Sequence, residues 1–113
     1  MKTFDQVWED ICCKLKHGQE IETICRKVKN TIVNIEQDGI TRNSERSRKG
    51  PMKIAKKDFE YVWNKIRDDG VYTLESIKDV RGRRAIICAI LAQLEYVKAE
   101  CEQGKVRLAL KND

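Results

Sequence analysis

The first eighteen residues carry an apolar stripe with helical spacing. Its positions follow one another at intervals of three and four residues: Phe4, Val7, Trp8, Ile11, Cys12 and Leu15. This periodicity is that of a helix with one buried face. Thr3, followed three residues later by Gln6, forms a capping box that predicts the start of the helix, and Gly18 predicts its end. We therefore expect an amphipathic helix between Thr3 and Gly18.

A two-residue alternation replaces the helical spacing after this segment. It is loose over residues 20–25 and clearer over residues 31–37 and 40–43, on either side of Asp38 and Gly39. An Asp-Gly pair between two strand-like runs is typical of a type I′ hairpin, because both turn residues of that hairpin adopt positive φ. We expect a β-hairpin that turns at Asp38-Gly39, and an interruption of regular structure at Gly50-Pro51.

Helical spacing returns in the second half of the chain. A helix over residues 56–69 is predicted by the stripe Phe59, Val62, Trp63 and Ile66, and Gly70 ends it. Tyr72 is expected to be extended, and Thr73 to cap a short helix that reaches Asp79. A further helix over residues 83–94 has an apolar face made of Ile86, Ile87, Ile90, Leu91 and Leu94.

The last fifteen residues alternate again and predict a C-terminal hairpin. Gln103 and Gly104 form the turn, and the apolar positions on either side of it are Val97, Ala99 and Cys101, then Val106, Leu108 and Leu110.

The order of the predicted elements over residues 56–110 defines the expected fold. Two helices joined by a short turn that contains Gly82 form a helix-turn-helix, and the hairpin that follows makes this half of the chain resemble a winged-helix domain. We expect a single α+β domain over residues 1–113. In it, an N-terminal helix and β-hairpin with a basic loop (1–55) precede a winged helix-turn-helix-like unit (56–113).

A second resemblance takes in more of the chain. The segments that carry it are residues 38–46, Phe59 with Trp63, Asp69-Gly70, residues 72–74 and residues 83–92. They are similar to small domains of bacterial restriction and phage-defence proteins, in which a hairpin and a winged helix form an accessory module. The resemblance implies a prokaryotic module that binds DNA or a partner protein, and it assigns no residue a role.

Positive charge is concentrated in residues 42–57. Seven basic residues and one acidic residue give this segment a net charge of +6, whereas the whole protein carries +5. A concentrated basic region in a protein of sequence pI near 9.0 is typical of a surface that binds polyanions. The alternative is a solvated loop that only maintains solubility. The candidate nucleic-acid contacts in this segment are Arg42, Arg46, Arg48, Lys49 and Lys53.

The positive charges at the end of this segment bear on the same choice. Lys56 and Lys57 lie in the first turn of the helix predicted over residues 56–69, where they oppose the helix dipole at a cost of a few tenths of a kcal/mol each. Because this placement destabilises the helix, it favours a polyanion partner for the two lysines over a purely structural role.

The predicted helix-turn-helix adds a second group of candidates. In such motifs the N-terminal side chains of the second helix contact bases in the major groove, and this position holds Arg81, Arg83 and Arg84. Lys105 comes from the predicted wing. The outward face of the same helix offers mostly small or weakly polar residues: Ala85, Cys88, Ala89, Ala92 and Gln93. We therefore expect binding dominated by phosphate contacts with little base readout, or, alternatively, a face that packs on another helix across a dimer.

The sequence indicates neither catalysis nor a metal site. His17 is the single histidine, the five cysteines include no Cys-x-x-Cys pair, and no phosphate-binding glycine loop occurs. We expect no catalytic residue, no cofactor and no metal. The first residues lack the pattern of a signal peptide, so we expect a cytoplasmic protein with no membrane partner, and five free thiols, with Cys12, Cys88 and Cys101 in the core.

Two hypotheses follow. The first is a non-catalytic DNA-binding module that holds double-stranded DNA through its phosphates. The alternative is a protein-interaction module without nucleic acid, such as an accessory subunit, an inhibitor or a homodimeric regulator with an acidic or apolar partner surface. For that alternative we expect Ala85, Ala89 and Tyr96, or the N-terminal helix, to be buried on association.

Overall fold

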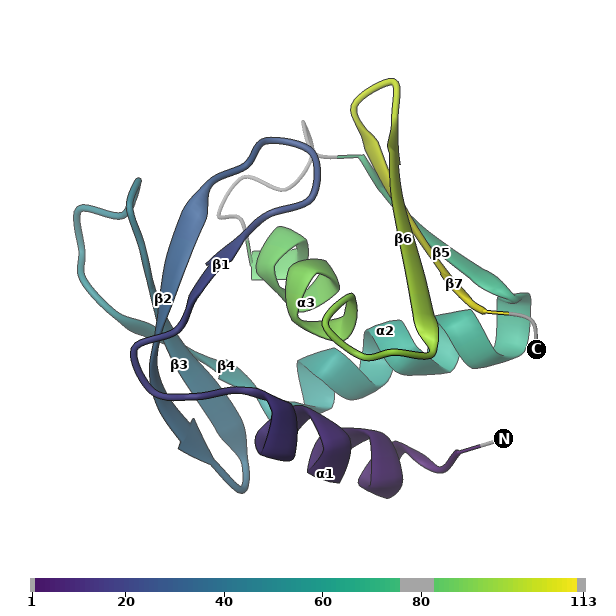
Figure 1. Ribbon diagram of the computed structural model, residues 1–113, viewed down its shortest axis with the longest axis horizontal. Helices are drawn as coiled ribbons and strands as arrows, with labels where there is room; N and C mark the ends of the chain where they lie inside the picture. The colour runs from purple at the N-terminus through teal and green to yellow at the C-terminus, as the bar shows by residue number, and fades with distance from the viewer. Residues whose placement is uncertain (1, 76–82, 112–113) are drawn as a thin grey trace.

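The computed structural model describes residues 2–75 and 83–111 and has a mixed α+β fold with two antiparallel sheets (Figure 1). The helices are α1 (Phe4–Lys14), α2 (Lys56–Asp69) and α3 (Arg83–Leu91). The strands are β1 (Glu20–Glu22), β2 (Lys29–Glu36), β3 (Gly39–Ser44), β4 (Met52–Ala55), β5 (Val71–Glu75), β6 (Val97–Glu102) and β7 (Lys105–Leu110). The capping box of Thr3 and Gln6 is present, but α1 ends at Lys14, before the predicted end at Gly18.

The first sheet has the strand order β1-β2-β3-β4. The predicted hairpin is confirmed, but its turn is formed by Gln37 and Asp38, because Glu36 pairs with Gly39. Neither Asp38 nor Gly39 has a positive φ, so the expected type I′ turn is wrong. The sequence also gave no indication of β4, which places residues 52–55 of the basic segment inside the sheet as an antiparallel partner of β3.

Gly39 is required for the close packing of β3 on β4. A Cβ atom at this position would lie 2.6 Å from the carbonyl oxygen of Ile54. Since that oxygen belongs to the backbone of the neighbouring strand, it cannot move without disturbing the sheet. The glycine of the Asp-Gly pair therefore serves strand packing and not the turn.

We expect Gly39→Ala to lower the free energy of unfolding by about 1–3 kcal/mol, the usual cost of overpacking. Urea denaturation followed by circular dichroism measures the change. Asn43→Ala is the matched control, because Asn43 is an exposed residue of the same strand, where a substitution changes stability by less than about 0.5 kcal/mol. Equal stability of the two variants would contradict this role for Gly39.

The second sheet has the strand order β5-β7-β6, and its first strand in the sequence, β5, comes directly after α2 (Figure 1). Gly70 ends α2 with φ +81°, as expected. Thr73 does not cap a helix: it lies in β5 and pairs with Arg107 of β7. The remainder of the helix expected up to Asp79, and the turn at Arg81 and Gly82, lie outside the described residues.

The C-terminal hairpin agrees with its prediction. Its turn residues Gln103 and Gly104 have φ of 52° and 77°. Two consecutive positive φ values are the requirement of a type I′ turn, which the protein meets here and not at Asp38-Gly39.

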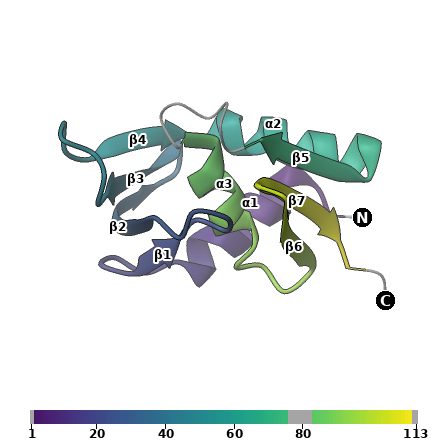
Figure 2. The same cartoon turned by 90° about the horizontal axis from the view of Figure 1, so that it is seen from above.

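The α3 helix lies between the two sheets, as both views show (Figures 1 and 2). Each of its residues from Ile86 to Leu91 is buried. The expected outward face is therefore wrong for Cys88 and Ala89, which are 0% and 1% exposed. A buried small-residue face explains why the sequence placed so few polar groups there, and its neighbours include β1 of the first sheet.

One hydrophobic cluster joins the two halves of the chain. It includes residues of α1, α2, α3 and both sheets, and its aromatic members pack edge to face: the ring centroids of Trp8 and Phe59 are 5.3 Å apart. Among the described residues, none of the helices has the length and apolar character needed to cross a bilayer.

A disulfide joins Cys25 to Cys101, with 5.3 Å between their Cα atoms. The expectation of five free thiols is therefore wrong, and so is the expected core position of Cys101, which is exposed. The bond connects the loop between β1 and β2 to strand β6, and thus links the two sheets covalently. Cys12, Cys13 and Cys88 are free.

Candidate nucleic-acid interface

Two loops leave the same end of the first sheet. The β1–β2 loop covers residues 23–28 and the β3–β4 loop residues 45–51, and antiparallel pairing of β2 with β3 brings them to the same end (Figure 1). The backbone N–H of Glu45 donates to the carbonyl oxygen of Lys29 at 2.9 Å, which fixes this neighbourhood.

These two loops and the start of β2 carry a group of exposed cations that we call the basic loop patch. It consists of Arg26, Lys27, Lys29, Arg46, Arg48 and Lys49. Within the described part of the chain, none of the six takes part in an ion pair. Glu22, opposite Lys29 in the β1–β2 pair, and Glu45 of the β3–β4 loop are the acidic residues beside them, so the patch keeps an excess of positive charge that can face an external anion.

Half of the basic loop patch was missed from the sequence. Arg26, Lys27 and Lys29 are a visible basic run, but they lie thirteen to sixteen positions before the basic segment of residues 42–57. Only the pairing of β2 with β3 brings the two runs together. The available signal was the hairpin itself, since a predicted β2–β3 pair places the residues before β2 at the same end of the sheet as the residues after β3.

The backbone of both loops is held by local hydrogen bonds. The buried hydroxyl of Thr23 accepts from the backbone N–H of Val28 at 3.0 Å. In the other loop, the hydroxyl of Ser47 donates to the carbonyl oxygen of Gly50 at 3.3 Å and accepts from the N–H of Lys49 at 3.4 Å. The hydroxyl groups of Thr23 and Ser47 thus bond to backbone groups of the two loops, and the basic side chains of the loops are exposed.

Two predicted contacts of the basic segment are not available in the same way. Arg42 is 3% exposed, so it does not contribute to the surface. Lys53 lies 2.7 Å from Asp38 and 3.3 Å from Glu36, and its charge is compensated by these carboxylates. Hydrogen bonding from Lys53 holds the pKa of the Asp38 carboxyl below its ordinary value of 3.8, and raises the pKa of Lys53 itself.

We expect Lys53→Met to raise the pKa of Asp38 back towards 3.8. Since the pKa is lowered in the folded protein, this pair contributes stability above the ordinary carboxyl pKa and loses it as the pH falls through the lowered value. An NMR titration of the Asp38 carboxyl carbon measures the shift. Asp10 is the control, because its pKa is lowered by Lys2 and Tyr96 and has to stay so in the variant. An unchanged Asp38 titration contradicts the assignment.

The candidates from the helix-turn-helix are dispersed. Arg81 lies outside the described residues, Arg83 is partly buried, and Arg84 is exposed with its guanidinium carbon 5.6 Å from the ring centroid of Tyr61. Lys105, in the predicted wing, lies 3.9 Å from Glu75. Lys98 of the neighbouring strand pairs with Glu100 at 3.1 Å. The wing therefore adds little net charge.

The start of α2 has a structural role that the sequence did not predict. The ammonium group of Lys56 lies 3.5 Å from Asp5 and 5.9 Å from the ring centroids of both Phe4 and Trp8. These contacts offset the unfavourable position of Lys56 at the helix start, so its charge does not require a polyanion. Lys57 remains exposed.

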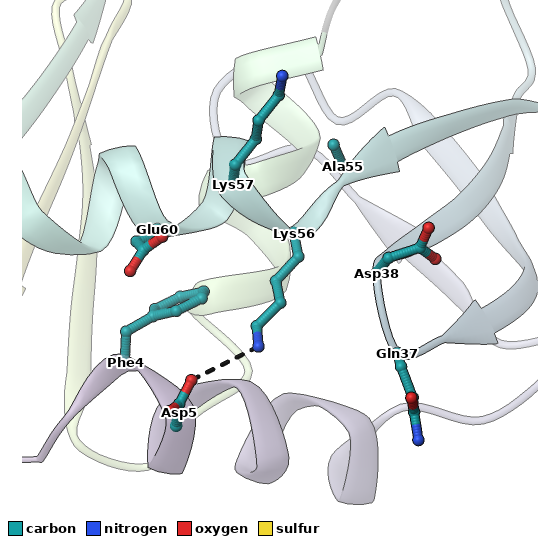
Figure 3. A pocket seen from close by; sticks show the side chains of 8 residues that line it. All are labelled: Phe4, Asp5, Gln37, Asp38, Ala55, Lys56, Lys57 and Glu60. Atoms are coloured by element: carbon teal, nitrogen blue, oxygen red, sulfur yellow. Dashed lines mark hydrogen bonds and ion pairs between the residues drawn. The ribbon is translucent and has the colours of Figure 1, made fainter.

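A hollow of about 460 Å³ lies between α1, the β2–β3 turn and the start of α2 (Figure 3). Figure 3 shows that Lys56 and Asp5 face each other across it, and its other lining residues are Phe4, Gln37, Asp38, Ala55, Lys57 and Glu60. Across residues 2–75 and 83–111, no group of metal-binding side chains is arranged to hold an ion. The hollow thus has mixed charge and no arrangement of groups typical of catalysis.

Two of the three thiols outside the disulfide are poorly placed to act as nucleophiles. Burial raises the pKa of Cys12, which disfavours its thiolate, and Cys88 is fully buried. Cys13 is exposed.

Comparison with protein-family models, with curated proteins and with solved structures finds no match to this chain. The function has to be argued from the residues and their arrangement.

Proposed function

We propose that this protein is a non-catalytic, cytoplasmic DNA-binding module that holds double-stranded DNA through phosphate contacts of the basic loop patch. The observation that carries the proposal is the gathering of six exposed cations, from two separate basic runs, at one end of a sheet without compensating ion pairs. Lysine and arginine side chains that neutralise phosphates supply most of the affinity of sequence-independent DNA binding. No base readout, metal or cofactor is part of this mechanism.

The proposal retains a winged-helix-like unit for residues 56–110. It is supported by the order α2, β5, α3, β6, β7 and by the sheet order β5-β7-β6, in which the last hairpin adds to the strand that follows the first helix. The way of binding differs from that of a helix-turn-helix. Since residues 86–91 of α3 are buried, only the start of this helix is exposed to a groove, and the proposed contacts come from the loops.

The cytoplasmic location has a consequence for the disulfide. In a reducing cytoplasm thiols are kept reduced, so Cys25 and Cys101 would be thiols there and the disulfide would belong to oxidising conditions. Without the bond the β1–β2 loop, which contains Cys25, is no longer tied to β6, while the hydrogen bonds within the two loops remain, since they do not involve either cysteine.

The alternative module, a homodimer or other protein partner, loses part of its expected interface. Ala89 is already buried within the chain. Tyr96 donates from its hydroxyl to Asp10 at 2.7 Å and packs its ring against Trp63. Ala89 and Tyr96 therefore make their contacts within the chain. The remaining alternative is an acidic protein that contacts the basic loop patch, and the experiment has to distinguish such a protein from DNA.

Fluorescence anisotropy of a labelled 15-base-pair duplex at 50 and 200 mM salt tests the proposal. Each phosphate contact contributes about 0.9 to the slope of log K against log salt, so four to six contacts lower the affinity by roughly 100- to 2,000-fold over this range. Binding that ignores salt, or none below about 100 μM at 50 mM salt, the weak edge of non-specific binding, contradicts DNA as the ligand. Light scattering of the protein alone then determines whether self-association occupies the surface.

A further inference from the structure

Tyr61 is a large aromatic residue on the outer face of α2. It is 49% exposed, and Val33 is the other large hydrophobic residue exposed within the described part of the chain. The buried stripe of α2 consists of Phe59, Val62, Trp63 and Ile66, so the helix packs without Tyr61. A single exposed hydrophobic residue is ordinary on a protein surface. Tyr61 differs from such a residue in the charged side chains that lie around it.

Cations surround this ring. The ammonium group of Lys65 lies 5.8 Å from the ring centroid, and the guanidinium carbon of Arg84 lies 5.6 Å from it. Lys57, one helical turn before Tyr61, is exposed on the same face of α2. Two carboxylates lie near this face: Asp58, one helical turn before Tyr61, and Asp68, which is held by Arg67 at 2.9 Å. The result is an aromatic ring with an excess of positive charge around it, contributed by α2 and the start of α3.

We propose that Tyr61 stacks on an unpaired nucleobase, while Lys57, Lys65 and Arg84 contact the phosphates beside it. This inference rests on the proposed function and extends its ligand to DNA with unpaired nucleotides, such as a duplex with a single-stranded end. Aromatic rings among basic residues are the means by which proteins hold single strands, because every base has a face that can stack. Bases inside a duplex already stack on each other and do not offer that face.

The burial of α3 indicates how Tyr61 contributes to recognition. With residues 86–91 of α3 covered, most of this helix is not exposed for major-groove readout. Stacking on Tyr61 distinguishes unpaired from paired nucleotides without hydrogen bonds to base edges. The module then recognises whether nucleotides are paired or unpaired, and not their sequence.

The longest dimension of the molecule is 39 Å. At about 3.4 Å per nucleotide, a strand of roughly twelve nucleotides has that length. A 15-nucleotide probe is therefore longer than the molecule, and its length does not limit its contacts.

The test compares three labelled probes by fluorescence anisotropy at 100 mM salt: 15-nucleotide oligothymidine, the same strand with abasic sites, and a 15-base-pair duplex. One stacked base contributes about 5- to 150-fold in affinity. We expect Tyr61→Ala to weaken binding of the normal single strand by such a factor, to leave the abasic strand and the duplex within twofold, and to be rescued by Tyr61→Phe. Since Tyr61 is half-exposed, an unchanged melting temperature serves as the control for folding.

Several results overturn the inference. If Tyr61→Ala weakens normal and abasic strands equally, or changes single-strand binding by less than twofold, Tyr61 does not stack on a base, although salt-dependent binding through the basic loop patch still stands. If none of the three probes binds with salt-dependent affinity, the proposed function fails together with the inference.

Discussion

Replacing both disulfide cysteines, Cys25→Ser with Cys101→Ser, is expected to lower the free energy of unfolding by about 4 kcal/mol. The two residues are 76 positions apart in the sequence, and cross-linking a loop of that length removes roughly this much chain entropy, taken as free energy, from the unfolded state. Small domains have a total stability of about 5–15 kcal/mol. The disulfide therefore accounts for a large share of the stability of the oxidised protein.

Urea denaturation of the oxidised protein, with and without a dithiol reductant, measures this contribution. The reductant and the double substitution should have equal effects. Cys13→Ser is the matched control, because Cys13 is exposed and free and its replacement should change stability by less than about 0.5 kcal/mol. A loss of under 1 kcal/mol in the double variant would show that the bond does not constrain the unfolded chain as this loop length requires.

Neutralising either half of the basic loop patch is expected to reduce DNA affinity by roughly 500-fold at 0.1 M salt. Each half provides three cations: Arg26, Lys27 and Lys29 on one side, and Arg46, Arg48 and Lys49 on the other. Three lost phosphate contacts lower the salt slope by about 2.7, and each contact is worth close to a factor of ten at this salt concentration. The two variants, each with three serine substitutions, should therefore lose DNA affinity equally, although Arg26, Lys27 and Lys29 lie outside the basic segment of residues 42–57.

A matched control separates location from net charge. Lys14, Lys16 and Lys111 are exposed and lie outside both loops. Their joint replacement by serine removes the same three charges, and we expect it to weaken binding by less than tenfold. If the control is as defective as the two loop variants, the protein binds DNA through its overall charge and not through the basic loop patch. Anisotropy titrations of all three variants provide the comparison.

The sequence predicted the elements that local patterns determine. The boundaries of α2 were correct because Phe59 to Ile66 follow one stripe and Gly70 supplies the left-handed end that a helix commonly adopts. The C-terminal hairpin was correct because the alternation on both sides of Gln103-Gly104 is unambiguous. In these elements the local preference and the tertiary position agree.

The errors come from contacts between distant segments. Thr73 has the local signal of a helix cap, but pairing with Arg107 draws it into a strand. Cys88 and Ala89 have the pattern of an outward helix face, which a second sheet covers. The disulfide between Cys25 and Cys101, the burial of Arg42 and the joining of two basic runs likewise depend on how the sheets are placed, and a single sequence does not specify that placement.

An NMR titration of the unmodified protein with the unlabelled 15-base-pair duplex tests the central claim most directly. We predict that the amide resonances of residues 24–29 and 45–50 shift together, with a common dissociation constant that rises steeply with salt, while those of α1 and of Gln37 and Asp38 do not move. Shifts confined to the hollow between α1 and α2, or the absence of any shift at low salt, would contradict the assignment of DNA binding to the basic loop patch.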